Sequence, residues 1–224
     1  MSRESERLLE VSGVVKRFGG FHALDGLSFH VSPGEILGLV GPNGSGKTTA
    51  INVISGLYAP DAGTVCFQQA PVGGMASHKL VHLGINRTFQ VPKPFMSLTV
   101  RQNVEVAHTY GNASDKTLPM ADLLERFHLA DVANRPESDL TNVQQKTLDL
   151  VRALATQPKL LLLDELAAGL NPTELDWIAG EIKTLAQSGL AIIVVEHLMG
   201  FIEQITDRVI VMNAGKEIFE GTLA

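Results

Sequence analysis

A glycine-rich segment ending in Lys and Thr, at residues 41–48, carries the strongest chemical signal in the sequence. It reads Gly41, Pro42, Asn43, Gly44, Ser45, Gly46, Lys47 and Thr48, with Thr49 opening a helical stretch over 49–57. This spacing matches G-x-x-x-x-G-K-[ST], in which the glycines let successive backbone N–H groups curl around phosphate oxygens. Lys47 would contact the β and γ phosphates, and the Thr48 hydroxyl would hold Mg²⁺. A plain glycine-rich turn is the alternative, but it leaves the lysine without a role.

Two adjacent acidic residues, Asp164 and Glu165, follow the apolar run 160–163. In an open α/β sheet, ligands bind at the carboxyl edge of the strands, where these side chains would emerge. Asp164 would hold Mg²⁺ through water, and Glu165 would act as general base toward an attacking water. Taken alone, the pair could equally be two solvated carboxylates at a strand end. Its co-occurrence with the glycine-rich segment favours the catalytic interpretation.

Two kinds of strand must position these residues. Segments 8–16 and 21–31, separated by Gly19 and Gly20, and segment 64–67 after a turn at 61–63 predict antiparallel strands. The continuous apolar runs 35–40, 160–164 and 191–195 predict parallel strands that are buried on both faces. Together they indicate a doubly wound sheet.

Residues 91–156 are predicted to be mostly helical, and capping boxes mark the starts of helices. Thr99 with Gln102 predicts one start, Thr141 with Gln144 predicts a helix through Leu148, Val151 and Leu154, and Asn171 with Glu174 predicts another, with Pro172 in its first turn. A further helix should begin at Pro119 and run through Phe127 to a loop at 134–136.

Composition restricts the function classes. The chain has 224 residues, a formal net charge of −6 and one cysteine, Cys66. The missing basic excess argues against a nucleic-acid partner, and the single cysteine fits a reducing compartment. The first ten residues lack the order of a secretory signal, and the apolar runs are too short to cross a bilayer. We therefore expect a cytoplasmic chain with at most a peripheral membrane role.

Across residues 8–222, the order and spacing of these elements resemble the ATPases of ABC transporters. The resemblance implies one α/β P-loop NTPase domain over 1–224, with a mostly parallel core sheet, an N-terminal antiparallel β subdomain and a helical subdomain inserted over 91–156. It implies ATP and Mg²⁺ as cofactors. Phe18 would stack on adenine, Gln90 would contact Mg²⁺ and the attacking water, and His197 would sense the γ phosphate. Alone, Phe18 is more typical of a core residue and His197 of a structural histidine.

Within the family, several sequence segments are most similar to the ATPases of branched-chain amino acid importers. They are Arg87-Thr88-Phe89-Gln90 followed by Leu98-Thr99-Val100, then residues 167–172, then Val211-Met212-Asn213. The ATPases of urea and amide importers share much of the sequence of these segments. The resemblance implies integral membrane permease subunits as partners, a periplasmic solute-binding protein as an indirect partner, and a place on the cytoplasmic face of the inner membrane.

The family's signature, usually Leu-Ser-Gly-Gly-Gln, stands here as Leu140-Thr141-Asn142-Val143-Gln144. In the family this element faces the ATP of a second ATPase subunit, and Val143 would hinder the close approach that glycine allows. Leu166 also replaces the usual proline after the catalytic Glu, which would loosen Glu165. We therefore expect a heterodimer with a second ATPase subunit. The alternatives are a regulatory subunit with little turnover, or a soluble ABC ATPase that acts on DNA or ribosomes.

An apolar run follows Gln90: Val91, Pro92, Pro94, Phe95, Met96 and Leu98. It is expected to form part of a groove for a helix of a membrane subunit. Packing inside the helical insert is the alternative.

Overall fold

Two β-sheets organise the chain. The computed structural model describes residues 7–90, 94–111 and 120–223. The first sheet is antiparallel and has the strand order β2-β1-β4-β5. Its strands are β1 (Leu9–Phe18), β2 (Phe21–Val31), β4 (Ala62–Phe67) and β5 (Ala70–Pro71). The three predicted strands are present, but the turn placed at 61–63 is wrong in part, because Ala62 already pairs with Val15.

The second sheet has the order β10-β9-β3-β8-β7-β6, and its neighbours from β9 to β6 run parallel. Its strands are β3 (Ile36–Val40), β6 (Ile85–Arg87), β7 (Leu160–Asp164), β8 (Ala191–Val195), β9 (Arg208–Asn213) and β10 (Lys216–Gly221). The three predicted parallel strands, β3, β7 and β8, are buried along their whole length. Strands β6, β9 and β10 were not among the predicted strands.

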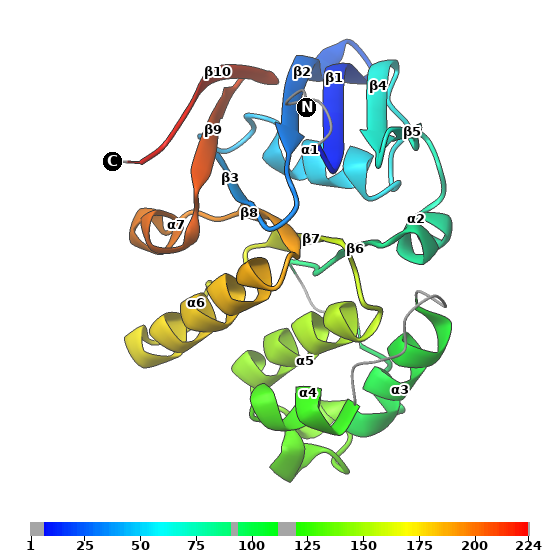
Figure 1. Cartoon of the computed structure of the whole chain (residues 1–224), viewed down its shortest axis with the longest axis vertical. Helices are drawn as coiled ribbons and strands as arrows, with labels where there is room; N and C mark the ends of the chain where they lie inside the picture. Colours follow the sequence, from blue (N-terminus) through cyan, green and yellow to red (C-terminus); the bar gives the residue numbers. More distant parts are fainter. Residues whose placement is uncertain (1–6, 91–93, 112–119, 224) are drawn as a thin grey trace.

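Alternate residues of the central strands enter two different cores. Leu160 and Leu162 pack with α1 (Lys47–Ile54) and the antiparallel sheet, whereas Leu161 and Leu163 pack with the helices on the opposite face. Successive strand side chains point to opposite faces, so a continuous apolar run fills both cores. Figure 1 shows α1 beside the antiparallel sheet and the other large helices on the far side of the core sheet.

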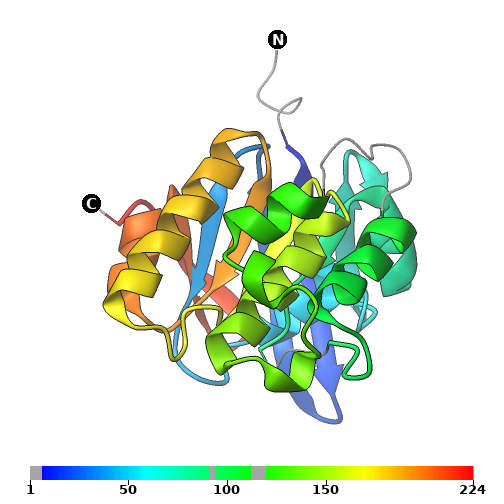
Figure 2. The same cartoon turned by 90° about the horizontal axis from the view of Figure 1, so that it is seen from below.

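The chain between β6 and β7 is largely helical. It contains α3 (Val100–Tyr110), α4 (Met120–Arg126), the 3₁₀ turns Ala130–Val132 and Glu137–Asp139, and α5 (Asn142–Ala155). In the view of Figure 2 these helices (green to yellow-green) lie in front of the strands, beside α6 (Pro172–Gln187). The predicted start at Pro119 lies outside the described residues.

All three predicted capping boxes are confirmed, at Thr99 of α3, Thr141 of α5 and Asn171 of α6. Two short helices, α2 (Ser77–Leu83) and α7 (Met199–Ile205), were not predicted. Across the described ranges, no helix combines the length and apolarity needed to cross a membrane.

Candidate functional site

A cavity of about 630 Å³ gathers residues from five separate segments of the chain. Its lining consists of Phe18, Phe21, Ala23, Asn43, Gly44, Gly46, Lys47, Thr48, Thr49, Gln90, Glu165, Val195 and His197. Most of the predicted site residues therefore meet in one place. Gly41, Pro42, Ser45 and Asp164 are not in the lining, and they lie in or beneath the loops that form it.

The glycine-rich loop joins β3 to α1 in a backbone conformation that only glycine tolerates. Gly46 has φ 107°, and a Cβ there would lie 2.5 Å from the carbonyl oxygen of Ala23. A Cβ on Gly41 would lie 2.2 Å from the carbonyl oxygen of Met212. Gly46 is also the N-cap of α1 and provides no side-chain hydrogen bond to it. The first N–H groups of α1 therefore have no capping side chain, which suits a phosphate at the positive end of the helix.

Lys47 lies under this loop. Its ammonium donates to the carbonyl oxygens of Gly41 at 2.8 Å and Pro42 at 2.9 Å, and only 5% of the residue is exposed. Burial lowers the pKa of Lys47 from its ordinary value, while the nearby charges of Glu165 and Asp164 oppose that shift. The lysine is thus a buried cation directly beneath the cavity.

Asp164 ends β7 and is 2% exposed. Its Oδ2 accepts from Arg87 Nη2 at 3.1 Å, while its Oδ1 accepts no hydrogen bond within the described part of the chain. Burial raises the pKa of Asp164, and the Arg87 guanidinium opposes the rise. A buried carboxylate oxygen without a partner is costly. The unpartnered Asp164 oxygen and the hydroxyl of Thr48, a residue that lines the cavity, are both of the donor type that Mg²⁺ or its bound water takes.

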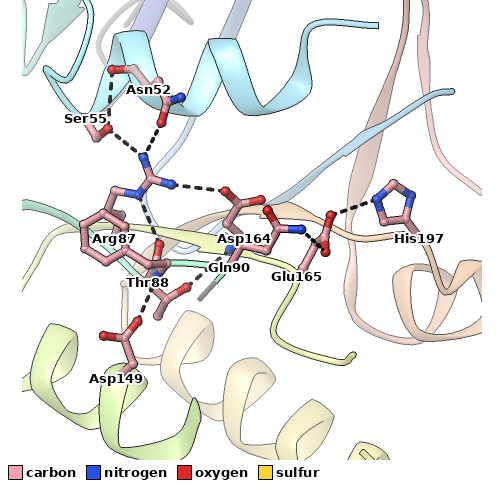
Figure 3. Close-up of polar contacts among 10 residues, drawn as sticks. Asn52, Ser55, Arg87, Thr88, Gln90, Asp149, Asp164, Glu165 and His197 are labelled. Carbon is pink, nitrogen blue, oxygen red and sulfur yellow. Dashed lines mark hydrogen bonds and ion pairs between the residues drawn. The ribbon is translucent and has the colours of Figure 1, made fainter. Parts of the chain in front are cut away.

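Arg87, at the end of β6, forms hydrogen bonds to residues of β7 and of the end of α1, as Figure 3 shows. Besides Asp164 on β7, its Nη1 donates to Asn52 Oδ1 at 2.6 Å and to Ser55 Oγ at 3.3 Å, at the end of α1. Sequence reasoning used Arg87 only as part of a family phrase and assigned it no role. No local signal in the sequence marks this role, because the contacts of Arg87 and of the neighbouring Thr88 hydroxyl, which accepts from the Asp164 N–H, arise only in the folded chain.

Two of the three predicted catalytic residues, Gln90 and His197, contact the third, Glu165, directly. Gln90 Nε2 donates to Glu165 Oε2 at 2.7 Å, and His197 Nε2 lies 3.0 Å from Glu165 Oε1. These contacts span 75 and 32 residues of sequence. Figure 3 shows the Glu165 carboxylate between the amide and the imidazole. Each carboxylate oxygen of Glu165 therefore has one side-chain partner, and the expected effect of Leu166 on Glu165 stays a prediction.

Two aromatic rings form the outer rim. Phe18 and Phe21 face each other across the β1–β2 hairpin, line the cavity and are 45% and 61% exposed. The ring of Phe18 packs edge-on against Tyr58, with centroids 5.2 Å apart. The core interpretation of Phe18 is therefore wrong. Phe21 was missed, although an aromatic pair flanking a Gly-Gly turn was visible in the sequence.

The residues that resemble the signature lie elsewhere. Thr141, Val143 and Gln144 line a second cavity of about 480 Å³ that shares no lining residue with the first. The chain thus does not bring its own signature to its own phosphate loop.

Part of the apolar run after Gln90 is solvent-exposed. Phe95 and Met96 are 47% and 71% exposed, so the core-packing alternative is wrong for both. The Phe95 N–H donates to Oδ1 of the fully buried Asn103, which fixes this segment to α3. Val91 and Pro92 lie outside the described residues.

Comparisons with known proteins agree on one family. The family model described as "ABC transporter" matches residues 24–168. The chain is 35% identical to the high-affinity branched-chain amino acid transport ATP-binding protein LivG of Escherichia coli (strain K12), covering 97% of this chain and 92% of LivG. It is 34% identical to the corresponding protein BraF of Pseudomonas aeruginosa, again covering 97% of this chain and 92% of BraF.

Among solved structures, a nucleotide-free ATP-binding cassette from an ABC transporter superposes with a TM-score of 0.87 at 32% identity, covering 96% of this chain and 91% of that one. A dimeric cassette bound to ADP and Pi has the same fold, with a TM-score of 0.86 at 24% identity, covering 96% of this chain and 99% of that one.

Proposed function

The chain belongs to the ABC transporter family and is an ABC-type ATPase, and we propose that it powers a membrane importer of branched-chain amino acids or related small polar solutes such as urea and amides. The observation that carries the proposal is the orientation of Glu165 by Gln90 and His197 beside the phosphate loop. The identity to LivG and BraF supports the solute class.

In the proposed mechanism, the adenine stacks on the Phe18 ring, and the phosphates lie on the loop 41–46 and the first N–H groups of α1. Lys47 turns its ammonium toward the β and γ phosphates. Thr48, Gln90 and Asp164 would hold Mg²⁺, which neutralises phosphate charge when bound. Glu165 accepts a proton from the attacking water as the water oxygen bonds to the γ phosphorus and the bond from the γ phosphorus to the β–γ bridging oxygen breaks, which releases phosphate and ADP. His197 and Gln90 keep the Glu165 carboxylate aimed at that water.

The proposed partners are integral membrane permease subunits, which would place the chain on the cytoplasmic face of the inner membrane and make a periplasmic solute-binding protein an indirect partner. The exposed Phe95 and Met96 would contribute to the groove that receives a permease helix, within a helical subdomain over 91–156. We expect Phe95→Asp and Met96→Asp to abolish uptake while ATP affinity is retained. Uptake that survives both substitutions would place the groove elsewhere.

The substrate is tested by reconstituting the chain and its permease subunits in vesicles with the solute receptor. We expect ATP-dependent uptake of radiolabelled leucine, with urea and acetamide as the competing solutes. A chain that fails to co-purify with any integral membrane subunit would contradict the transport function.

We also propose pairing with a second ATPase subunit. In a head-to-tail dimer, Val143 would face ATP held by the partner, so a homodimer would contain two impaired sites and a heterodimer only one. A regulatory subunit with little turnover is the second candidate function, and the same residue favours it. The ATPase rate of the purified chain, measured against its concentration, separates these cases. A high, concentration-dependent rate from the chain alone would contradict both.

A further inference from the structure

Two charged side chains hold the backbone that follows Glu165. Lys146 Nζ donates to the carbonyl oxygens of Glu165 at 2.9 Å, Leu166 at 3.4 Å and Ala168 at 2.7 Å. Glu196 Oε1 accepts from the Ala167 N–H at 2.6 Å. Every residue of the segment 165–168 therefore has a backbone group bound to one of these two side chains.

Neither side chain lies on the open surface. Glu196 is 4% exposed, and Lys146 is partly buried along α5. Acidic and basic residues are seldom buried unless they are paired or hydrogen-bonded. Each of these two charges lessens the cost of burying the other. An ordinary surface lysine and glutamate would not be placed in this way, so their position calls for a role in the segment that they hold.

The segment needs external support. Glu165 has φ 52°, in the left-handed region that a residue with a Cβ seldom occupies. Leu166 lacks the ring that would fix φ at a proline. Such a backbone persists only when the surroundings determine it, and the four hydrogen bonds supply that determination together with the Glu165 N–H, which donates to the Val195 carbonyl oxygen at 2.9 Å. They fix the direction in which the Glu165 side chain leaves the main chain.

Glu196 and Lys146 each lie close in sequence to another part of the proposed site. Glu196 directly precedes His197, which contacts the Glu165 carboxylate. Lys146 lies in the second turn of α5, whose N-cap is Thr141 in the segment that resembles the signature. A shift of α5 along its axis would therefore move the Lys146 ammonium against three carbonyl oxygens of the catalytic segment.

We propose that Lys146 and Glu196 are positioning residues for Glu165, and that Lys146 links the position of α5 to the aim of the catalytic carboxylate. The inference rests on the proposed function of Glu165 as general base. It accounts for an oriented carboxylate at a site where the usual proline is absent.

The test is steady-state ATP hydrolysis by the full chain assembled with its partner subunits. Lys146→Met keeps most of the aliphatic stem and removes the donor. We expect kcat to fall by about 10- to 100-fold, as small misplacements of a catalytic group do, with the KM for ATP within about threefold. Lys146→Arg, which retains donors, should restore most of the rate. Lys183→Met, on the exposed face of α6, is the matched control and should hydrolyse ATP normally.

A second variant separates positioning from stability. Lys146→Met removes a cation whose nearby charge favours the ionised form of the buried Glu196, and adding Glu196→Gln removes the Glu196 charge while keeping an acceptor for the Ala167 N–H. The double variant should regain thermal stability and remain slow. If kcat recovers together with the Tm, or if Lys146→Met alone hydrolyses ATP normally, the positioning role is refuted.

Glu165→Gln, measured in parallel, separates the role of Lys146 from the role of Glu165 itself. Loss of turnover in Glu165→Gln with normal turnover in Lys146→Met would refute only the positioning role. Normal turnover in Glu165→Gln would refute the proposed role of Glu165 itself.

Discussion

Two helix N-termini in this chain, those of α1 and α5, satisfy their first N–H groups in opposite ways. Helix α1 starts after Gly46, which is left-handed and offers no capping side chain. Helix α5 starts after Thr141, whose hydroxyl accepts from the Gln144 N–H at 3.2 Å, while Gln144 Oε1 accepts from the Thr141 N–H at 3.0 Å. The first helix leaves its N-terminal donors for a ligand, whereas the second uses the Thr141 and Gln144 N–H groups in its own capping box.

This difference explains why the two motifs depart from their family to different degrees. In the loop before α1, a Cβ on Gly41 or Gly46 would clash with the carbonyl oxygen of Met212 or Ala23, so the fold itself requires these two glycines. The α5 start forms a complete capping box whether or not a phosphate approaches, so Val143 is compatible with the fold of this chain. We therefore expect the phosphate loop of this chain to bind ATP well, and the segment that resembles the signature to contribute only weakly to the binding of ATP held by a partner ATPase.

The largest expected effect is at Glu165. In Glu165→Gln the amide keeps the shape of the side chain but cannot accept the proton, so kcat should fall by about 10²- to 10⁴-fold while ATP binding is retained. Steady-state hydrolysis and calorimetric titration measure the two quantities. Glu203→Gln, on exposed α7, is the control. Near-native hydrolysis by Glu165→Gln would mean that the phosphate-loop side has another base.

The second prediction concerns the ion pair between Arg87 and Asp164. Arg87→Met leaves Asp164 buried without its cation and should lower the free energy of unfolding by about 3 to 5 kcal/mol. Denaturant unfolding measures this loss, and adding Asp164→Asn should restore part of it. Arg17→Met, at the exposed hairpin, should change stability little. An unchanged midpoint in Arg87→Met would show that α1 and β7 do not depend on this ion pair.

Third, Lys47→Ala should weaken ATP binding about 10- to 100-fold, because each charge-assisted hydrogen bond to a phosphate contributes about 1.5 to 3 kcal/mol. Calorimetric titration of the isolated chain with ATP measures the change, and Lys79→Ala on α2 serves as the control. Equal ATP affinities in the two variants would contradict the proposal that the start of α1 binds the phosphates.

The smallest expected effect tests the signature side. Val143→Gly should improve binding of ATP held by the partner ATPase by about tenfold, since it recovers one backbone contact across the interface. ATP affinity of the isolated chain should not change, because Val143 does not line its cavity. Val143→Ala, which removes the β-branch only, should fall between the two. An altered affinity in the isolated chain would contradict the separation of the two cavities.

Local signals in the sequence determined several parts of this protein. The glycine-rich segment, the caps at Thr99, Thr141 and Asn171, and the apolar runs of β3, β7 and β8 could all be predicted. In each, the residues that interact lie within about four positions of one another, or share a periodicity that burial imposes. Strand β6 was missed because Ile85–Arg87 is too short to show any periodicity.

The partners of the charged side chains were decided by tertiary structure. Arg87 meets Asp164 across 77 residues, Gln90 and His197 meet at Glu165, and Lys146 reaches the carbonyl oxygens of 165–168. A buried charge must find a partner, but the sequence alone does not say which one, because that depends on which strand ends and helix turns the packed core brings within hydrogen-bonding distance. The motifs could therefore be predicted one by one, whereas the contacts that orient Glu165 arise only when both faces of the core sheet are packed.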